Sequence, residues 1–230
     1  MLSGCGVPPR KPTVFCAASL TPTVEQALEQ LELDASVQGA GSRTLLNQLK
    51  AGARADIVLL ADPRLQQQLP PESVSRSANI AGNSLVLVRR LGPTPKPAAT
   101  LESPSLTLAV ADPGTAPLGH YSAQALTNRS LKCKTVRLKN AGAVLAAVLL
   151  EHVDIGLIYA SDLKNNPQLE VLEKLSASTH DPIRYRAVRL NSVNAGADRL
   201  FDFLTSSKGK ALLQEQGFEE LEPEPPISRR

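Results

Sequence analysis

The feature that most constrains the fold is a series of short apolar runs, each followed by a segment with helical spacing of apolar residues. The clearest run is 56–62, in which Ile57, Val58, Leu59, Leu60 and Ala61 lie between two aspartates. A continuous apolar run of this length is typical of a strand that is buried on both faces. The segment 106–112 has the same form and also ends in an aspartate. The chain is therefore expected to contain sheets that are covered by helices.

The same alternation continues along the chain. We expect further strands at 13–16, 84–88 and 154–159, and helices at 21–31, 44–50, 121–127, 141–150, 195–205 and 209–216. Alternating strands and helices predict an α/β architecture with mostly parallel sheets. The proline-rich stretch 91–105 interrupts the pattern either as an interdomain linker or, as we prefer because strands flank it closely, as a surface excursion.

Composition excludes several classes of partner. The 230 residues are 42% apolar, 20% charged and only 3% aromatic, with a net charge of +3 from interspersed charges. A nucleic-acid-binding protein usually shows a basic stripe or an aromatic platform, so we expect no nucleic-acid partner. In the printed sequence no run approaches the roughly 18–20 apolar residues that a membrane-spanning helix requires.

Catalytic motifs are not evident. The three histidines occur outside HExxH and GxSxG contexts; they are His120, His152 and His180. Three aspartates that end expected strands are explained as caps of the next turn; they are Asp62, Asp112 and Asp162. Cys16 ends the first strand, where a nucleophile could lie, but like Cys133 it is interpreted as a buried free thiol. We expect no enzyme activity, no cation site and no cofactor.

Four strand–helix junctions suit an anion instead. The first amides of a helix have no partner within the helix, and the positive end of its dipole favours negative charge. The residues at these junctions are Ser19, Ser42, Leu118 and Ala141, the last preceded by the possible cap Asn140. Each junction alone is explained as an ordinary helix start.

Eight short segments of the sequence, taken together, indicate a family resemblance. They are FCAASLT at 15–21, GSRTL at 41–45, GARAD at 52–56 with AD at 61–62, GNSLVLV at 82–88, DP to PLGHY at 112–121, GLIYASD at 156–162, His180 with PIRY at 182–185, and GF at 217–218. In this order they resemble the motifs of the molybdate-binding proteins of bacterial ABC transporters, from Thr13 to Phe218.

This resemblance implies a two-lobed, type II periplasmic-binding fold, in which each lobe is a mixed sheet flanked by helices and the ligand lies in the interlobe cleft. It implies an oxyanion held by neutral donors: hydroxyl and backbone groups of Ser19 and Ser42, backbone amides of Leu118 and Ala141, and the phenol of Tyr159. Leu118 and Ala141 replace the Ala and Val that are common in the family, and Cys16 replaces a common Ala.

The expected organisation follows from the order of these motifs. Residues 1–11 form a tether, 12–82 with 191–218 form lobe 1, 83–190 form lobe 2, and 219–230 form a C-terminal tail. The C-terminal helices are assigned to lobe 1 because they need a partner for their apolar faces.

The function implied is that of the extracytoplasmic binding subunit of an ABC transporter, which delivers molybdate or tungstate to a membrane permease, with a monomer expected. No Asp or Glu falls at the five matched positions. A donor-only site suits a fully deprotonated oxyanion better than phosphate, which carries a proton near neutral pH. The alternatives are a sulfate-type or other oxyanion-binding protein, a cytoplasmic oxyanion-sensing domain on the same fold, and a small enzyme that reuses it.

Cys5 follows Leu2-Ser3-Gly4, a string that resembles the lipobox of bacterial lipoproteins. A charged segment and an apolar segment should precede such a cysteine, and only four residues do. Either the start of this sequence is misassigned or trimmed, or the match arises by chance. Cys5 is thus a candidate site of lipid attachment.

Overall fold

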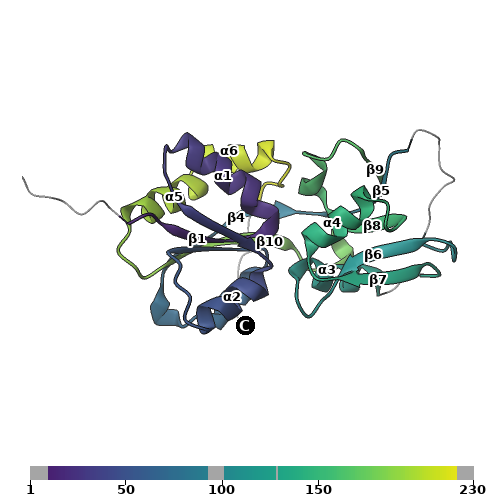
Figure 1. Cartoon of the computed structure of the whole chain (residues 1–230), viewed down its shortest axis with the longest axis horizontal. Coiled ribbons are helices and arrows are strands. Elements are labelled where there is room, and N and C mark those ends of the chain that lie inside the picture. The colour runs from purple at the N-terminus through teal and green to yellow at the C-terminus, as the bar shows by residue number, and fades with distance from the viewer. Residues whose placement is uncertain (1–9, 93–100, 128, 222–230) are drawn as a thin grey trace, which may run out of the picture.

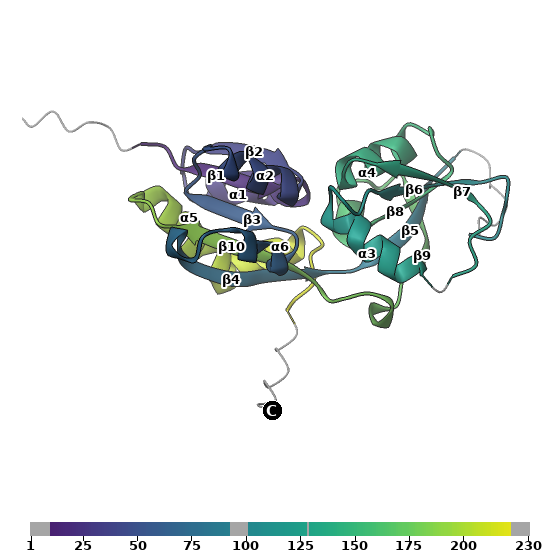
Figure 2. The same ribbon diagram turned by 90° about the horizontal axis from the view of Figure 1, so that it is seen from below.

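The computed structural model describes residues 10–92, 101–127 and 129–221. These residues form two lobes side by side along the long axis of the molecule, each built on its own five-stranded sheet (Figures 1 and 2). Most of the tether 1–11, the candidate lipidation site Cys5, most of the tail 219–230 and part of the proline-rich stretch 91–105 lie outside the described residues.

Lobe 1 contains the sheet β2-β1-β3-β10-β4. Its strands are β1 (Thr13–Ala17), β2 (Ser36–Ala40), β3 (Ile57–Leu60), β4 (Val74–Asn83) and β10 (Ile183–Leu190). Strand β1 runs parallel to β2 and β3, whereas β10 runs antiparallel to β3 and β4. Its helices are α1 (Thr21–Gln30), α2 (Ser42–Lys50), α5 (Ala195–Thr205) and α6 (Ser207–Glu215).

Alternating side chains of β3 explain why this sheet is covered on both faces. Ile57 and Leu59 belong to the same apolar cluster as the buried residues of α1, α5 and α6. Val58 and Leu60 point to the opposite face, where a second cluster includes Leu45 of α2. Because successive side chains of a strand point to opposite faces, a continuous apolar run is required here rather than an alternating one.

Lobe 2 repeats this plan with the sheet β7-β6-β8-β5-β9. Its elements are β5 (Leu85–Arg90), β6 (Thr107–Ala111), α3 (Pro117–Leu126), β7 (Lys134–Leu138), α4 (Ala141–Leu149), β8 (Ile155–Tyr159) and β9 (Leu169–Lys174). Strand β6 is parallel to β7 and β8, and β5 is antiparallel to β8 and β9. Both sheets are therefore mixed, and the expectation of mostly parallel sheets from alternation alone was too simple.

The boundary between the lobes differs from the expected one at a single strand. Strand β4 ends at Asn83 and β5 begins at Leu85, so the first crossing lies close to the expected position. The second crossing lies between β9 and β10, within 175–182, because β10 is hydrogen-bonded to β3 and β4 of lobe 1. Residues 183–190, which we had assigned to lobe 2, belong to the sheet of lobe 1. The alternating pattern of β10 shows that one face is buried but does not show in which lobe.

The chain returns to the crossing region at its C-terminal end. Gly82 and Glu219 form an isolated antiparallel bridge, with N–H to O=C distances of 2.8 and 3.0 Å. The Phe218 ring packs edge-on against Tyr185 of β10, with the ring centroids 5.0 Å apart. In the described part of the chain, the helices are too short or too polar to cross a membrane.

Arg189 of β10 connects the sheet of lobe 1 to the start of α5 through buried hydrogen bonds. Its side chain is only 2% exposed, and its guanidinium donates to the carbonyls of Asp56, Ser192 and Asn194 and to the carboxylate of Asp198. The N–O distances of these four bonds lie between 2.9 and 3.2 Å. A buried guanidinium with so many acceptors leaves several polar groups without partners when it is removed.

We predict that Arg189→Leu lowers the free energy of unfolding by about 3 kcal/mol, because the buried carbonyls lose their donor. Arg76→Leu is the matched control, since Arg76 also pairs with Asp198 but is 44% exposed. It should cost about 1 kcal/mol or less, as is usual for exposed ion pairs. Urea unfolding of the three proteins measures both values. Equal losses would show that Arg189 makes no special contribution.

Candidate functional site

The five residues singled out in the sequence come together around one cavity between the lobes. The cavity has a volume of about 20 Å³ and is lined from lobe 1 by Ala17, Ala18, Ser19, Ala40, Gly41, Ser42 and Ala61. From lobe 2 it is lined by Ala116, Pro117, Leu118, Asn140, Ala141 and Tyr159. The lining thus combines small residues with a few polar groups.

On the side of lobe 1, two serine hydroxyls face the cavity. Ser42 is the first residue of α2 and is 1% exposed, and its Oγ accepts a hydrogen bond from the amide of Ala61 at 3.1 Å. Its own hydroxyl proton therefore remains free for another acceptor. Ser19 lies in the short helical turn Ala18–Leu20 between β1 and α1, and its Oγ is 3.2 Å from the hydroxyl of Tyr185.

On the side of lobe 2, two helices begin at the cavity. Leu118 is the second residue of α3, and Ala141 is the first residue of α4. Amides at these positions have no partner within their helix. Asn140 is the N-cap of α4, as expected, and its Oδ1 accepts from the amide of Ala143 at 2.9 Å. The cap leaves the amide of Ala141 available to a ligand.

Gly119 shows how tightly the start of α3 is held. A Cβ atom at this position would lie 2.5 Å from the carbonyl oxygen of Asp112, at the turn after β6. Real Cβ atoms do not come so close to backbone, so only glycine allows the helix to pack against this turn. The packing fixes the position of the Leu118 amide.

Tyr159 closes the cavity at the end of β8. Its side chain is 2% exposed, and no described residue lies within hydrogen-bonding distance of its hydroxyl. Burial, with smaller contributions from Tyr185 and Tyr121, raises the pKa of the Tyr159 phenol well above its usual value. The phenol therefore keeps its proton and can donate it. A buried hydroxyl without a partner is costly, and an acceptor in the cavity would satisfy it.

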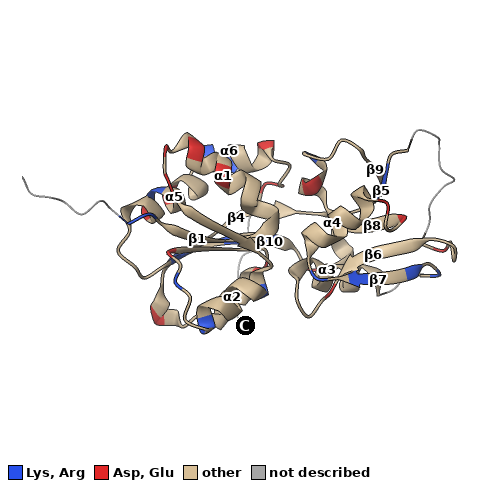
Figure 3. Ribbon diagram, viewed as in Figure 1, with Lys and Arg blue, Asp and Glu red and all other residues tan. Residues whose placement is uncertain are grey.

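The cavity lining contains no Asp, Glu, Lys, Arg or His. Figure 3 shows that α3 and α4, on the side of lobe 2 that faces lobe 1, carry no charged residue along their length. Among the residues that the structure describes, no group of three His, Cys, Asp or Glu side chains could hold a metal ion. The donors present suit an anion and offer nothing to a cation.

Beside the cavity, charged groups connect the lobes. Arg64 of lobe 1 is 2.8 Å from Asp181, which lies on the second crossing, and it also binds Asp62. The same Asp181 carboxylate accepts from Gln124 of α3 at 2.9 Å and lies 3.5 Å from His120. Gly41 is also close to lobe 2, since a Cβ there would be 3.4 Å from the carbonyl oxygen of Thr115. The lobes are in contact around the cavity.

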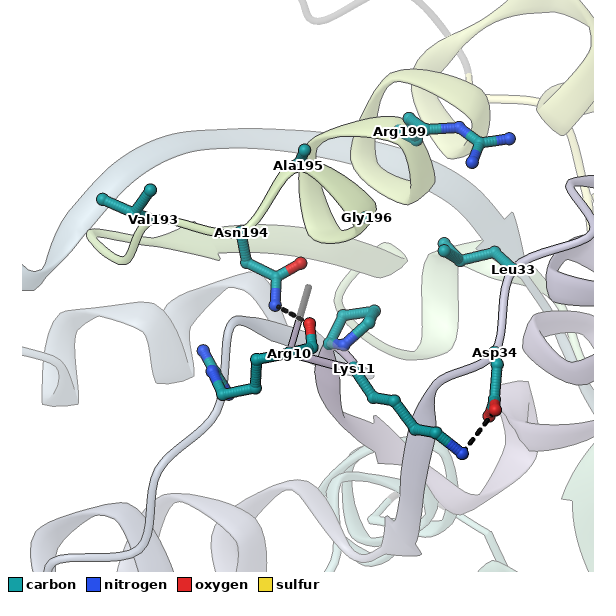
Figure 4. Close-up of a pocket in the computed structure, with 10 residues that line it drawn as sticks. Arg10, Lys11, Leu33, Asp34, Val193, Asn194, Ala195, Gly196 and Arg199 are labelled. Carbon is teal, nitrogen blue, oxygen red and sulfur yellow. Dashed lines mark hydrogen bonds and ion pairs between the residues drawn. The ribbon is translucent and has the colours of Figure 1, made fainter. Parts of the chain in front are cut away.

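A larger hollow lies at the far end of lobe 1 and differs in chemistry (Figure 4). It has a volume of about 620 Å³ and lies between the first described residues and the start of α5. Its charged groups have partners: Lys11 pairs with Asp34, Arg10 with Asp56, and Arg199 donates to the carbonyl of Leu31. None of the five predicted residues lines it.

Other candidate groups lie outside the cavity lining. Cys16 is buried, and burial raises the pKa of its thiol to about 12, which leaves little reactive thiolate and fits a packing role. Cys133 is likewise buried with a free thiol. Asp62 and Asp112 cap turns as expected, accepting from the amides of Arg64 and Gly114. The Oδ2 atom of Asp162 has no partner among the described residues.

Comparison with known proteins shows the family of this chain. The family model for bacterial extracellular solute-binding proteins matches residues 12–219. The chain belongs to this family. The two-lobed fold expected from the sequence motifs is confirmed.

Individual relatives cover almost the whole chain. The molybdate-binding protein ModA of Haemophilus influenzae is 28% identical and covers 90% of this chain and 89% of that protein. The putative ABC transporter substrate-binding lipoprotein YvgL of Bacillus subtilis is 26% identical, with coverages of 90% and 85%. A solved structure described as the substrate binding domain of a putative molybdenum ABC transporter from Clostridium difficile is 26% identical, with a TM-score of 0.69 over 92% of this chain and 99% of that one.

The motifs did not identify every residue around the cavity. The small residues at the ends of β1, β2 and β3 also line it, and a signal for them was present in Ala17-Ala18, Ala40-Gly41 and Ala61. Small side chains at the carboxyl ends of neighbouring strands leave room for a ligand at that edge. Asn83 and Tyr185, which contact the site from behind, lie in the motifs at 82–88 and 182–185, but the motifs assigned them no role in the site.

Asp162, next to this site, generates a prediction about pH. Burial raises the pKa of its carboxyl to about 7, and a backbone hydrogen bond with Tyr159 offsets part of the shift. Between about pH 4 and pH 7 the folded protein holds this proton more strongly than the unfolded chain, whose Asp has a pKa near 3.9. The contribution of Asp162 to stability therefore falls as pH rises through this window.

We expect Asp162→Asn to remove this pH-dependent loss of stability. The stability of the variant relative to wild type should therefore increase as pH rises from 4 to 7. Thermal unfolding across this range measures the difference. Asp34→Asn is the control, because that carboxylate is 70% exposed. A difference between Asp162→Asn and wild type that does not change with pH would contradict the burial of an ionisable group at this position.

Proposed function

We propose that this protein binds molybdate or tungstate in the interlobe cavity and delivers it to the membrane permease of an ABC transporter. The observation that carries the proposal is the buried hydroxyl of Tyr159, which has no partner among the described residues and borders a cavity whose other polar groups are also donors. The Ser42 and Ser19 hydroxyls and the amides of Leu118 and Ala141 complete the set. Similarity to the molybdate-binding protein of Haemophilus influenzae supports this choice of ligand.

The donor set favours an oxyanion without protons. A dianion buried without donors is prohibitively costly, and charge-assisted hydrogen bonds from N–H and O–H groups offset that cost. Hydrogen phosphate carries a proton that needs an acceptor, and no carboxylate lines the cavity. Sulfate would satisfy the same donors but is smaller, so it should leave some of them poorly engaged.

The proposal includes transport rather than catalysis. Five donors come from two lobes, so an anion between them favours the closed arrangement, which a permease could recognise. We propose an extracytoplasmic monomer. Lipid attachment at Cys5 is part of the proposal and is supported by the similarity to a putative lipoprotein of Bacillus subtilis.

The proposed function predicts which anions the protein binds. We expect molybdate and tungstate to bind with a stoichiometry of one and sub-micromolar affinity, and sulfate to bind at least about tenfold more weakly, a difference of ~1.4 kcal/mol. Isothermal calorimetry of the purified protein against molybdate, tungstate, sulfate and phosphate measures this. Equal affinities for sulfate and molybdate would contradict the specificity, and no binding of any oxyanion would contradict the function.

The proposed function also predicts the effect of removing single hydrogen-bond donors from the cavity. Tyr159→Phe removes one hydroxyl donor to the anion and should weaken molybdate binding roughly tenfold to hundredfold. The ligand-free protein should not lose thermal stability, because the removed hydroxyl has no partner there. Tyr121→Phe is the matched control, since Tyr121 is equally buried but does not line the cavity.

Ser42→Ala should weaken molybdate binding to a similar extent, although it also lowers stability by removing the acceptor of the Ala61 amide. Leu118→Ala should change affinity much less, because its donor is the backbone amide. A larger loss of affinity for Leu118→Ala than for Ser42→Ala, at comparable melting temperatures, would show that these roles are wrongly assigned.

A further inference from the structure

A chain of buried hydrogen bonds begins at the first crossing between the lobes and ends at the candidate site. Asn83, the last residue of β4, is 5% exposed and contacts residues of both lobes. Its Oδ1 accepts from the backbone amides of Ser84 at 3.0 Å and Ser161 at 3.3 Å. Its Nδ2 donates to the Ser161 hydroxyl at 2.8 Å and to the Tyr185 hydroxyl at 3.2 Å.

These contacts determine the orientation of the Asn83 amide. Backbone amides can only donate, so the atom that faces Ser84 and Ser161 must be the oxygen. The NH₂ group then faces the two hydroxyls, and both of its protons are used. Tyr185 therefore accepts a hydrogen bond from Asn83.

In the next hydrogen bond of the chain, Tyr185 donates and Ser19 accepts. The Tyr185 side chain is fully buried, and its one hydroxyl proton has the Ser19 Oγ, 3.2 Å away, as its acceptor among the described residues. If Ser19 donated instead, the Tyr185 proton would be buried without a partner, which is costly. Burial also raises the pKa of Tyr185, so the phenol keeps this proton.

We infer that Asn83 and Tyr185 are positioning residues, which make the Ser19 hydroxyl a hydrogen-bond donor toward the cavity. Ser19 accepts from Tyr185, so its own proton is left for a ligand. This inference rests on the proposed function, because it gives Ser19 a fixed polarity in an oxyanion site. It also adds a source of selectivity: the Ser19 oxygen already accepts from Tyr185, which disfavours a second acceptor role toward the proton of an anion such as hydrogen phosphate.

A double-mutant cycle on the full chain tests the inference, with sodium molybdate as the probe. Tyr185→Phe keeps the ring that packs edge-on against Phe218 and removes only the donor to Ser19. We expect it to raise the Kd for molybdate about tenfold in the wild-type background and to have no further effect in a Ser19→Ala background. If the two effects multiply instead, Tyr185 does not act through Ser19 and the inference is wrong.

Two further measurements separate positioning from a general structural effect. Tyr185→Phe should leave the Kd for inorganic phosphate unchanged or lower it, because the freed Ser19 hydroxyl can then turn to accept the proton of phosphate. A loosened structure would weaken both ligands and would overturn the inference. Ser161→Ala removes a hydroxyl bound to the same Asn83 amide but leaves the bonds from Asn83 to Tyr185 and from Tyr185 to Ser19 intact. It should change the Kd for molybdate by less than about twofold, and a loss as large as that of Tyr185→Phe would also count against the inference.

The outcomes distinguish failure of the inference from failure of the proposed function. Tight molybdate binding by wild type with no loss in Ser19→Ala would overturn the role of Ser19 and uphold the function. No binding of molybdate or tungstate by wild type would overturn the function and, with it, the inference that depends on it. Melting temperatures of the ligand-free variants show whether each protein is folded in these comparisons.

Discussion

The anion that we propose for the interlobe cavity must be satisfied by hydrogen-bond donors, and this constraint accounts for the arrangement of elements around the cavity. An anion removed from water loses its hydration, and every oxygen must find an N–H or O–H group in return. Here the donors are mostly set by backbone geometry, because α2, α3 and α4 each begin at the cavity and present amides that their own helices cannot use. The sheets make this possible, since β1, β2 and β7 each end at most three residues before the next helical segment begins.

The two crossings connect the donors of one lobe to those of the other. At the first crossing, Asn83 holds the Ser161 amide just after Tyr159 and contacts Tyr185 behind Ser19. At the second crossing, Asp181 binds both Arg64 of lobe 1 and Gln124 of α3. A change in the angle between the lobes would therefore disturb groups that support the site. This arrangement gives the cavity a geometry that depends on both lobes at once.

Sequence patterns predicted β1, β3, β5, β6 and β8 and missed β10 and the strands at the sheet edges, largely for a physical reason. Strands β3, β6 and β8 are buried throughout or nearly so, which makes their apolar runs continuous. Strands β2 and β7 lie at sheet edges and are largely exposed, so their sequences resemble loops. The five residues of the candidate site were found through motif resemblance. Asn83 and Tyr185 fall within two of the motifs, but their role was not predicted, since their contact joins residues 102 positions apart and leaves no local pattern.

The neutrality of the cavity has a consequence for selectivity. A lysine or arginine inside it would attract any anion strongly and with little regard to shape, because charge acts over distance. Amide and hydroxyl donors act over a short range and in fixed directions. They therefore stabilise a bound oxyanion only when its oxygens lie where the donors point. Arg64, which lies beside the cleft, is outside the lining and is bound by Asp62 and Asp181. Its charge is thus largely compensated, which leaves the directional donors to decide which anion is held.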